Sequence, residues 1–396
     1  MDALFFAGNR RALIEECGKG VLVMSGYTAL QLSADMAIPF CQEANFWYLT
    51  GIEESDWQLI MTPAENWLVA PDISEVHRVF GGGLSNEQAT NISGVKNIIT
   101  QTEAQNLRVR LAEEYGTAYS LGDHPHQKYF NFTVNPAGGK LWRQLKKQFS
   151  EVRDIRRDLS RLRAIKQPAE IAAIKKAINV TVNAFERAYQ KFDSYEYEYQ
   201  IDADFTYEFR NVNATHAYDP IVAGGVNACT LHYSQNAAKL ERPSLVLLDI
   251  GAKVDGYPAD ITRTYATGRP TDRQKSVHAV VLGAHREIIS LLKPGLTFEK
   301  YQEEVDRIMK RALIHLGLLK TDADYRRYFP HAISHGLGVD VHDSLGGFNE
   351  FKEGMVLTVE PGIYIPKEDI GVRLEDDILI TGSGHKNLSE ALSLEL

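Results

Sequence analysis

The stretch at residues 244–265, SLVLLDIGAKVDGYPADITRTY, decides how the second half of the chain folds. An apolar run ends at Asp249, and the dipeptide Asp255-Gly256 follows it. Asp-Gly between apolar segments is among the strongest short signals for a two-residue hairpin turn. The pattern therefore predicts an antiparallel hairpin in which Tyr257–Tyr265 is the returning strand.

The register of this hairpin brings two carboxylates together. With Asp255-Gly256 as the turn, Val254 pairs with Tyr257, and Asp260 becomes the diagonal neighbour of Asp249 on the same face. Their Cβ atoms are then within about 7–8 Å of each other. Two carboxylates this close, one of them ending an apolar run, repel each other and are poorly solvated. A cation between them would remove both costs, although the hairpin alone leaves open two solvated aspartates on an exposed face.

Three histidines fall within residues 331–342, HAISHGLGVDVH. The spacing of His331 and His335 is that of the zinc-protease helix, but Ala332 stands where that motif needs glutamate. The two glycines that follow His335 argue against a continuous helix. The segment therefore predicts one histidine ligand of a metal, with the other histidines around it.

A fourth histidine, His232, stands between Leu231 and Tyr233. A histidine beside such neighbours is more often a core residue with its hydrogen bonds satisfied. The local pattern alone therefore favours a structural role for His232.

Two glutamates follow apolar segments near the end of the chain. Met355–Val359 leads into Glu360, and Gly371–Leu374 leads into Glu375. A carboxylate buried at the end of such a segment must be paired or bound to a metal. For Glu375, an ion pair with Arg373 is the local alternative.

Composition sets the limits within which these motifs are interpreted. The chain has 396 residues, 44% of them hydrophobic and 24% charged, and its formal net charge is −9. This length suits two domains, and the acidic balance argues against nucleic acid or an anionic membrane as a partner. Three cysteines without metal-ligand spacing favour a reducing compartment. With no signal-peptide pattern and no membrane-length apolar run, we expect a cytoplasmic protein.

The chain is expected to form two domains, at residues 1–158 and 159–396. Apolar runs at Val21–Met24 and Trp57–Met61 predict strands of a mixed α/β first domain. The stretch Lys140–Arg163, rich in charged residues, marks the boundary. Amphipathic helices are predicted from Pro168 onward and near Arg273–Leu292 and Phe298–Leu316.

Taken together, residues 160–396 resemble the methionine aminopeptidase/prolidase superfamily, whose catalytic domain has the pita-bread fold. The order carboxylate, carboxylate, histidine, glutamate, glutamate is complete in this chain. The resemblance implies an α+β protein, with a pita-bread catalytic domain preceded by a smaller mixed α/β N-terminal domain. It implies the metal ligands Asp249, Asp260, His335, Glu360 and Glu375.

The same resemblance assigns further residues to catalysis. His232, His331 and His342 match the histidines that surround the metals in the proline-directed branch of the superfamily. It implies that Glu360 also moves a proton and that His232 and His342 steady the carbonyl oxygen and the developing oxyanion. His331 would form a wall for the proline ring, and Arg373 would anchor a ligand or the substrate.

Within the superfamily the chain looks most like aminopeptidase P, because Phe46–Gly51 and Leu231–Tyr233 resemble segments of that group. The expected substrate is a peptide with proline at its second position. The expected cofactors are two divalent ions, whose four positive charges four carboxylates would offset. Ligation by oxygen and one imidazole favours Mn²⁺, with Co²⁺ and Zn²⁺ as alternatives. The segment Tyr364–Gly371 is shorter than in the larger bacterial enzymes, which leaves the preferred substrate length open.

Two other functions are compatible with parts of this pattern. A prolidase has the same metal site but accepts only Xaa-Pro dipeptides. A non-catalytic pita-bread protein would bind a partner, but such proteins should have lost metal ligands, and here all five are present. Relatives are commonly dimers or tetramers, so we expect a homo-oligomer.

Overall fold

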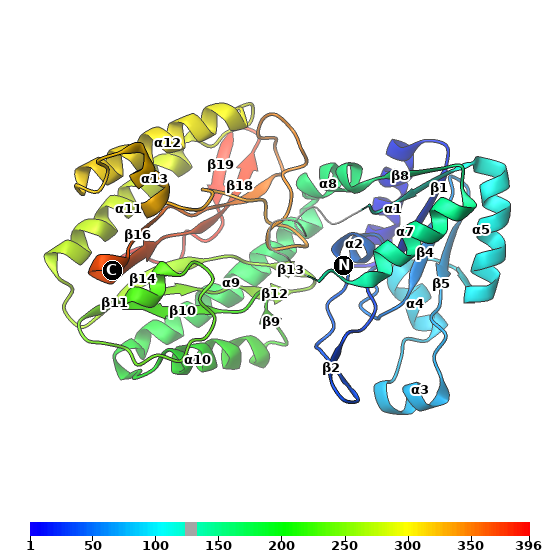
Figure 1. The fold of residues 1–396 in the computed structure, drawn as a ribbon, viewed down its shortest axis with the longest axis horizontal. Helices are drawn as coiled ribbons and strands as arrows, with labels where there is room; N and C mark the ends of the chain where they lie inside the picture. Colours follow the sequence, from blue (N-terminus) through cyan, green and yellow to red (C-terminus); the bar gives the residue numbers. More distant parts are fainter. Residues whose placement is uncertain (123–132) are drawn as a thin grey trace. The chain divides into compact units, whose positions relative to one another are not determined.

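Figure 1 shows a computed structural model of the protein, which describes residues 1–122 and 133–396. The chain divides into two compact units, Met1–Leu162 and Arg163–Leu396. The charged stretch Lys140–Arg163 runs from helix α7 (Pro136–Gln148) through strand β8 (Glu151–Asp154) into helix α8 (Arg156–Ala164). The division after Leu162 falls inside α8, as does the boundary predicted after residue 158. Both units combine helices and sheets, as expected for an α+β protein.

The N-terminal unit is built on a six-stranded mixed sheet in the order β6-β5-β4-β1-β7-β8. The predicted strand at Val21–Met24 is its centre: β1 pairs antiparallel with β4 and parallel with β7. Side chains of α5 and α7 pack on apolar residues of β1 and β4. The strands are β1 (Val21–Ser25), β4 (Gln58–Met61), β5 (Asn66–Val69), β6 (Asn97–Ile99), β7 (Thr117–Ser120) and β8 (Glu151–Asp154), and β2 (Gln31–Ser33) pairs separately with β3 (Met36–Ala37). The helices are α1 (Ala3–Cys17), α2 (Ala44–Thr50), α3 (Glu75–Gly81), α4 (Asn86–Ser93), α5 (Gln101–Tyr115) and α7 (Pro136–Gln148).

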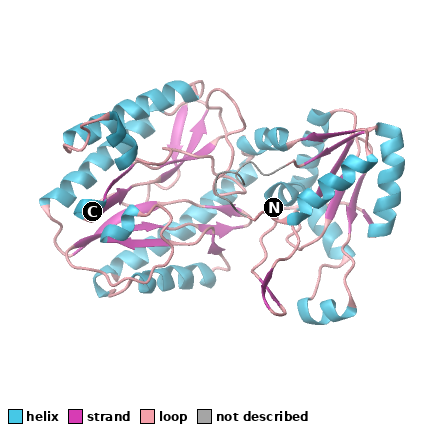
Figure 2. Cartoon of the chain, in the orientation of Figure 1, coloured by secondary structure: helices cyan, strands magenta, loops and turns pink. Residues whose placement is uncertain are grey.

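The C-terminal unit holds its short strands between two groups of helices (Figure 2), with α9 and α10 on one side and α11 and α12 on the other. Its sheets have the orders β10-β11-β14, β13-β12-β9 and β15-β18-β19, together with the pair β16-β17. The strands are β9 (Thr215–His216), β10 (Ile221–Gly224), β11 (Ser244–Asp249), β12 (Ala252–Val254), β13 (Tyr257–Pro258), β14 (Thr262–Thr267), β15 (Val356–Val359), β16 (Gly362–Ile365), β17 (Ile370–Arg373), β18 (Asp376–Thr381) and β19 (Gly384–Asn387). The helices are α9 (Pro168–Gln190), α10 (Glu198–Asn211), α11 (Asp272–Leu291), α12 (Phe298–His315) and α13 (Asp322–Tyr328).

The three long helices of this unit follow the predicted ones closely. Helix α9 begins at Pro168, where the backbone N–H of Gln167 donates to the side chain of Glu170 (2.9 Å). A proline in the first turn costs no hydrogen bond, because the N–H there has no partner within the helix. The apolar faces of α11 and α12 meet in one core with β15 and β17.

The hairpin has the predicted register. Val254 pairs with Tyr257, and Asp249 pairs with Thr262. The returning strand is not continuous, however, because β13 ends at Pro258 and β14 begins at Thr262. The prediction of one strand over Tyr257–Tyr265 was therefore wrong for residues 259–261, where the chain passes from one sheet to another.

This crossing depends on glycine at position 251. A Cβ atom on Gly251 would lie 1.8 Å from the backbone oxygen of Ala259. Because the obstructing atom belongs to the backbone, it cannot turn aside as a flexible side chain would. The close approach of the two chain segments therefore excludes any side chain at this position.

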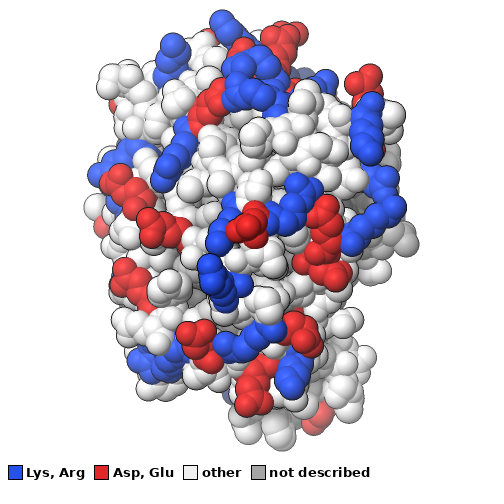
Figure 3. Space-filling model, turned by 90° about the vertical axis from the view of Figure 1, so that its left-hand side faces the viewer, with Lys and Arg blue, Asp and Glu red and all other residues white. Residues whose placement is uncertain are grey.

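Charged side chains are mixed on the face drawn in Figure 3, where Lys and Arg alternate with Asp and Glu. A mixed distribution of this kind is typical of a solvated surface. Among the described residues, no helix combines the length and the apolar character needed to cross a membrane.

We predict that Gly251→Ala lowers the stability of the protein by about 1–3 kcal/mol, the usual cost of overpacking. The matched control is Gly283→Ala in α11, where an added Cβ meets no atom within 4 Å. Alanine is the better helix former, so this control should be as stable as the unchanged protein or up to about 1 kcal/mol more stable. Thermal unfolding of both variants decides the matter. Equal midpoints for Gly251→Ala and the unchanged protein would contradict the close approach at Ala259.

Candidate metal centre

The candidate centre is a cavity of about 70 Å³ in the C-terminal unit. Asp249 is the last residue of β11, Glu360 follows β15, and Glu375 lies just beyond β17. Every site residue predicted from the sequence lines this cavity, and Leu231 is the one further residue. The lining residues are Leu231, His232, Asp249, Asp260, His331, His335, His342, Glu360, Arg373 and Glu375.

Backbone hydrogen bonds explain why these distant segments meet. The Thr358 N–H donates to the carbonyl oxygen of His335 (2.9 Å), and the Glu360 N–H donates to that of Ile333 (3.0 Å). The histidine-rich loop therefore runs beside β15. On the opposite wall, the Glu375 N–H donates to the carbonyl oxygen of Thr262 (3.1 Å).

The donor atoms form overlapping groups, within each of which all atoms lie within 4.8 Å of one another. Glu375 belongs to two of these groups. Two neighbouring metal positions, one on each side of its carboxylate, could therefore each be surrounded by the donors of one group. The groups are Asp249 with Asp260 and Glu375, His335 with Glu360 and Glu375, and Asp260 with His335 and His342. Four carboxylates and an imidazole are suitable ligands for divalent metal ions.

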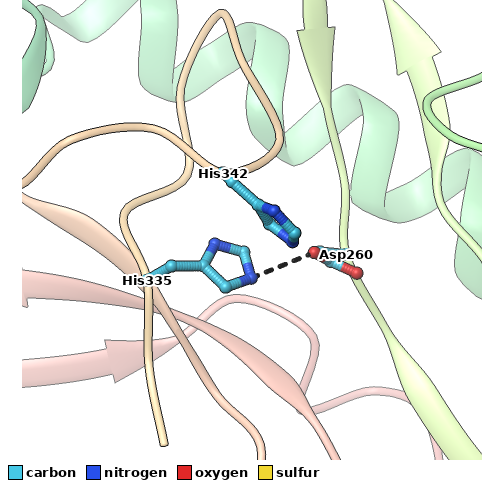
Figure 4. Close-up of side chains that lie close together, drawn as sticks. All are labelled: Asp260, His335 and His342. Atoms are coloured by element: carbon cyan, nitrogen blue, oxygen red, sulfur yellow. Dashed lines mark ion pairs between the residues drawn. The ribbon is translucent and has the colours of Figure 1, made fainter. Parts of the chain in front are cut away.

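The ring of His335 points at the carboxylate of Asp260, with His342 beside it (Figure 4). His335 Nε2 lies 3.4 Å from Asp260 Oδ2 and 3.6 Å from Glu360 Oε1. Burial alone would lower the pKa of His335, but its hydrogen bond to Asp260 and the two nearby carboxylates raise it to about 9. In the protein without metal, the imidazolium thus supplies part of the positive charge that the centre requires.

For the other carboxylates, the cost of burial outweighs the effect of the nearby positive charges. Burial raises the pKa of Glu360 to about 7. Burial, and then repulsion by Asp260, raises the pKa of Glu375 well above its usual value. Desolvation also raises the pKa of Asp249, against the opposing charge of Arg373. Because a bound divalent cation favours the ionised form of each carboxylate, the residues present fit a metal centre.

Tyr218, which the sequence did not single out, supports the same conclusion. Its hydroxyl oxygen lies 2.6 Å from Asp249 Oδ1 and also 2.6 Å from Asp260 Oδ1. A phenol has one proton and can donate to only one of these oxygens at a time. The other carboxylate oxygen then faces a lone pair at short range, an arrangement that a nearby cation stabilises. Tyr218 lies between β9 and β10, far from any motif, so no local pattern could have identified it.

Arg373 pairs with a different carboxylate from the one expected locally. Its guanidinium donates to Asp249 Oδ2, to the hydroxyl of Tyr364 (2.9 Å) and to Thr262 Oγ1 (3.2 Å). Glu375, the suggested partner, instead accepts a hydrogen bond from the Thr262 hydroxyl (2.6 Å). The two-residue separation of Arg373 and Glu375 in the sequence therefore did not predict an ion pair correctly. The partner of Arg373 depends instead on how β11, β14 and β17 meet.

His331 is held by hydrogen bonds on both ring nitrogens. Nε2 lies 2.8 Å from the Tyr364 hydroxyl, and Nδ1 lies 2.7 Å from the carbonyl oxygen of Ala332. Burial, followed by the charge of Arg373, lowers the pKa of His331 to about 3. The ring is thus neutral near pH 7, and Arg373 and Tyr364 fix its orientation.

His232 and His342 both line the cavity. Their ring centroids are 6.4 Å apart, and those of His335 and His342 are 4.3 Å apart. His232 is exposed and is not a core residue, so the interpretation that its neighbours favoured locally was wrong. Both rings can reach a group bound in the cavity.

Comparison with known proteins places the chain in a family. The sequence profile of metallopeptidase family M24 matches residues 172–382. The chain belongs to metallopeptidase family M24. A second profile, that of the aminopeptidase P N-terminal domain, matches residues 6–119 of this M24 peptidase. The resemblance stated from the sequence motifs is confirmed, and the family implies a metal-dependent hydrolase.

Individual relatives of this M24 peptidase agree with the family assignment. It is 33% identical to a Xaa-Pro aminopeptidase of Haemophilus influenzae, over 91% of this chain and 88% of the relative. It is 36% identical to a Xaa-Pro dipeptidase of Pyrococcus horikoshii, over 62% of this chain and 67% of the relative. Its structure is similar to that of a putative aminopeptidase P from Bacillus anthracis, with a TM-score of 0.88, 32% identity and coverage of 100% and 96% of the two chains.

We predict that His342→Ala keeps its full metal content and lowers kcat about 10²–10³-fold, the usual effect of losing a donor to a developing oxyanion. His342 is itself a member of one donor group, together with Asp260 and His335, so its place outside the ligand set needs a test. Metal content is measured by atomic emission after loading with Mn²⁺ and desalting. His335→Ala, which removes an expected ligand, is the control that should lose metal. Loss of a full metal equivalent in His342→Ala would make His342 a ligand.

Proposed function

We propose that this protein is a two-metal Xaa-Pro aminopeptidase, which removes the first residue from peptides that have proline at the second position. The observation that carries the proposal is the pair of donor groups that share Glu375, with three further histidines around them. The ligands proposed for the two ions are Asp249, Asp260, His335, Glu360 and Glu375. Their oxygen-rich set favours Mn²⁺, with Co²⁺ or Zn²⁺ as substitutes.

When bound, two divalent ions supply Lewis-acid chemistry and lower the pKa of water near the scissile carbonyl. Glu360 is the proposed proton carrier, because its carboxylate lines the cavity and can accept a proton from water and release it again. It would take the proton from the attacking water and deliver it to the proline nitrogen as the Xaa–Pro bond breaks.

The histidines and Arg373 are assigned to orientation and charge stabilisation. His232 and His342 would donate hydrogen bonds to the carbonyl oxygen, whose negative charge grows in the transition state. His331, neutral and fixed by Tyr364, would form a wall for the proline ring. Arg373 would hold Asp249 in place through their ion pair.

Preference for proline has a physical basis in such a site. The Xaa–Pro bond is a tertiary amide without an N–H. A peptidase that must accept a hydrogen bond from that group fails on this bond. A centre that binds the free amino terminus and the carbonyl group does not need it.

A prolidase is the second candidate, because 62% of the chain is also similar to a Xaa-Pro dipeptidase. A dipeptidase must bind the carboxylate of its substrate's proline, and a buried carboxylate needs a cation. Arg373 is a cation that lines the cavity, but its donors are directed at Asp249, Tyr364 and Thr262. This engagement favours an aminopeptidase that accepts longer peptides.

A purely binding role is disfavoured, because all five expected ligands lie on one cavity. The cytoplasmic location, the assembly into dimers or tetramers and the lack of nucleic-acid or membrane partners stay predictions from the sequence.

We predict that Ala-Pro-Ala is cleaved at the Ala–Pro bond, and with a higher kcat/KM than the dipeptide Ala-Pro. The reason is the lack of an available cation for the carboxylate of a dipeptide at Arg373. Both peptides are assayed with Mn²⁺, and Ala-Ala-Ala is the control for the requirement for proline. A dipeptide preference of tenfold or more, about 1.4 kcal/mol of transition-state stabilisation, would identify a prolidase instead.

A further inference from the structure

Glu198, the first residue of α10, is a buried carboxylate with no part in the proposed chemistry. Its exposed fraction is 0%. Each of its oxygens accepts two hydrogen bonds, which fills the usual acceptor capacity of a carboxylate. The donors are Gly224 N (2.8 Å) and Asn227 Nδ2 (3.0 Å) on Oε1, and Tyr233 Oη (2.8 Å) and Ala238 N (2.8 Å) on Oε2.

All four donors belong to one segment, residues 224–238, which leaves β10 and carries His232. The Glu198 backbone holds the far end of the segment as well, since its N–H donates to the carbonyl oxygen of Ala238 (3.0 Å). The near end is fixed because β10 pairs with β11, where Ile221 lies opposite Asp249. Glu198 therefore joins both ends of the segment to each other.

A second polar side chain, that of Asn236, holds the segment where it runs back toward β10. Asn236 accepts a hydrogen bond from Val222 N (3.0 Å) and donates one to the carbonyl oxygen of Pro220 (2.9 Å). Between these fixed points the chain turns at Thr230, whose carbonyl oxygen accepts from Tyr233 N (3.2 Å). His232 occupies this turn and directly precedes the tyrosine whose hydroxyl is held by Glu198.

This arrangement fixes the position of His232 at the cavity. His232 lines it, and its ring lies 6.4 Å from that of His342. The orientation of its ring therefore depends on a segment that the Glu198 carboxylate holds through two backbone N–H groups and two side chains. Displacement of a catalytic group by about 1 Å can reduce a rate about 10²-fold.

We propose that Glu198 is a positioning residue for the peptidase reaction: it holds residues 224–238 so that His232 faces the metal centre. The proposal rests on the proposed function, and in particular on the role of His232 at the carbonyl oxygen. It requires that loss of Glu198 slows turnover through His232 and leaves the metal ligands in place.

The first test is Glu198→Gln. An amide replaces one acceptor oxygen with an NH₂ group, which cannot accept from a backbone N–H. The new NH₂ can donate to the Tyr233 hydroxyl, but the Ala238 N–H on the same side then loses its acceptor. We expect kcat on Ala-Pro-Ala to fall about tenfold or more, with KM within about threefold and metal content unchanged.

The matched control is Glu208→Gln on the same helix, whose carboxylate pairs with Arg187 (2.9 Å). It should keep the kcat of the unchanged protein. Tyr233→Phe is the second variant, to be used if Glu198→Gln does not fold. It keeps the charge of Glu198 and removes one hydrogen bond, so kcat should fall about two- to tenfold.

A double-mutant cycle with His232→Ala separates positioning from a general structural effect. If Glu198 acts through His232, Glu198→Gln should reduce kcat by less than about twofold once His232 is absent. Equal losses in the two backgrounds would overturn the proposal. An unchanged kcat in His232→Ala would overturn it as well, together with the role of His232. Mn²⁺-dependent cleavage by the unchanged protein tests the proposed function separately.

Discussion

Mutual repulsion among buried carboxylates is the constraint on which the rest of the structure depends. Asp249, Asp260 and Glu375 lie within 4.8 Å of one another, and Glu360 shares a second group with Glu375. Charges of one sign in a site shielded from water destabilise the fold unless opposite charge lies beside them. His335 and Arg373 supply part of that charge, and divalent ions would supply the remainder.

Residues outside the cavity hold its walls in place against this repulsion. Arg263, fully buried, donates to the carbonyl oxygen of Glu375 (2.7 Å) and forms an ion pair with Asp376 (2.7 Å). It also donates to the carbonyl oxygens of Leu392 and Ser393. Arg263 therefore connects residues 392–393 to the strands that hold the ligands. Rigid walls keep the donor atoms in place, which is what a preorganised centre requires.

Local sequence signals predicted those parts of the site that depend on local structure. The Asp-Gly turn fixed the strand register that places Asp249 near Asp260, because a two-residue turn allows only one register. The partner of Arg373, the hydroxyl of Tyr218 and the four bonds of Glu198 were not predicted. Each arises where segments far apart in the chain meet, and such contacts have no signature at either end. The metal ligands themselves came from the family resemblance, since spacing alone left solvated or paired alternatives open.

The number of Mn²⁺ ions bound per chain, titrated together with the rate of Ala-Pro-Ala cleavage, tests the central claim most directly. A centre built from two donor groups that share Glu375 should bind two ions. The protein stripped of metal by a chelator should be inactive, and activity should return as the sites fill. Full turnover by metal-free protein would contradict the account, and so would complete activity with a single bound ion and no second site.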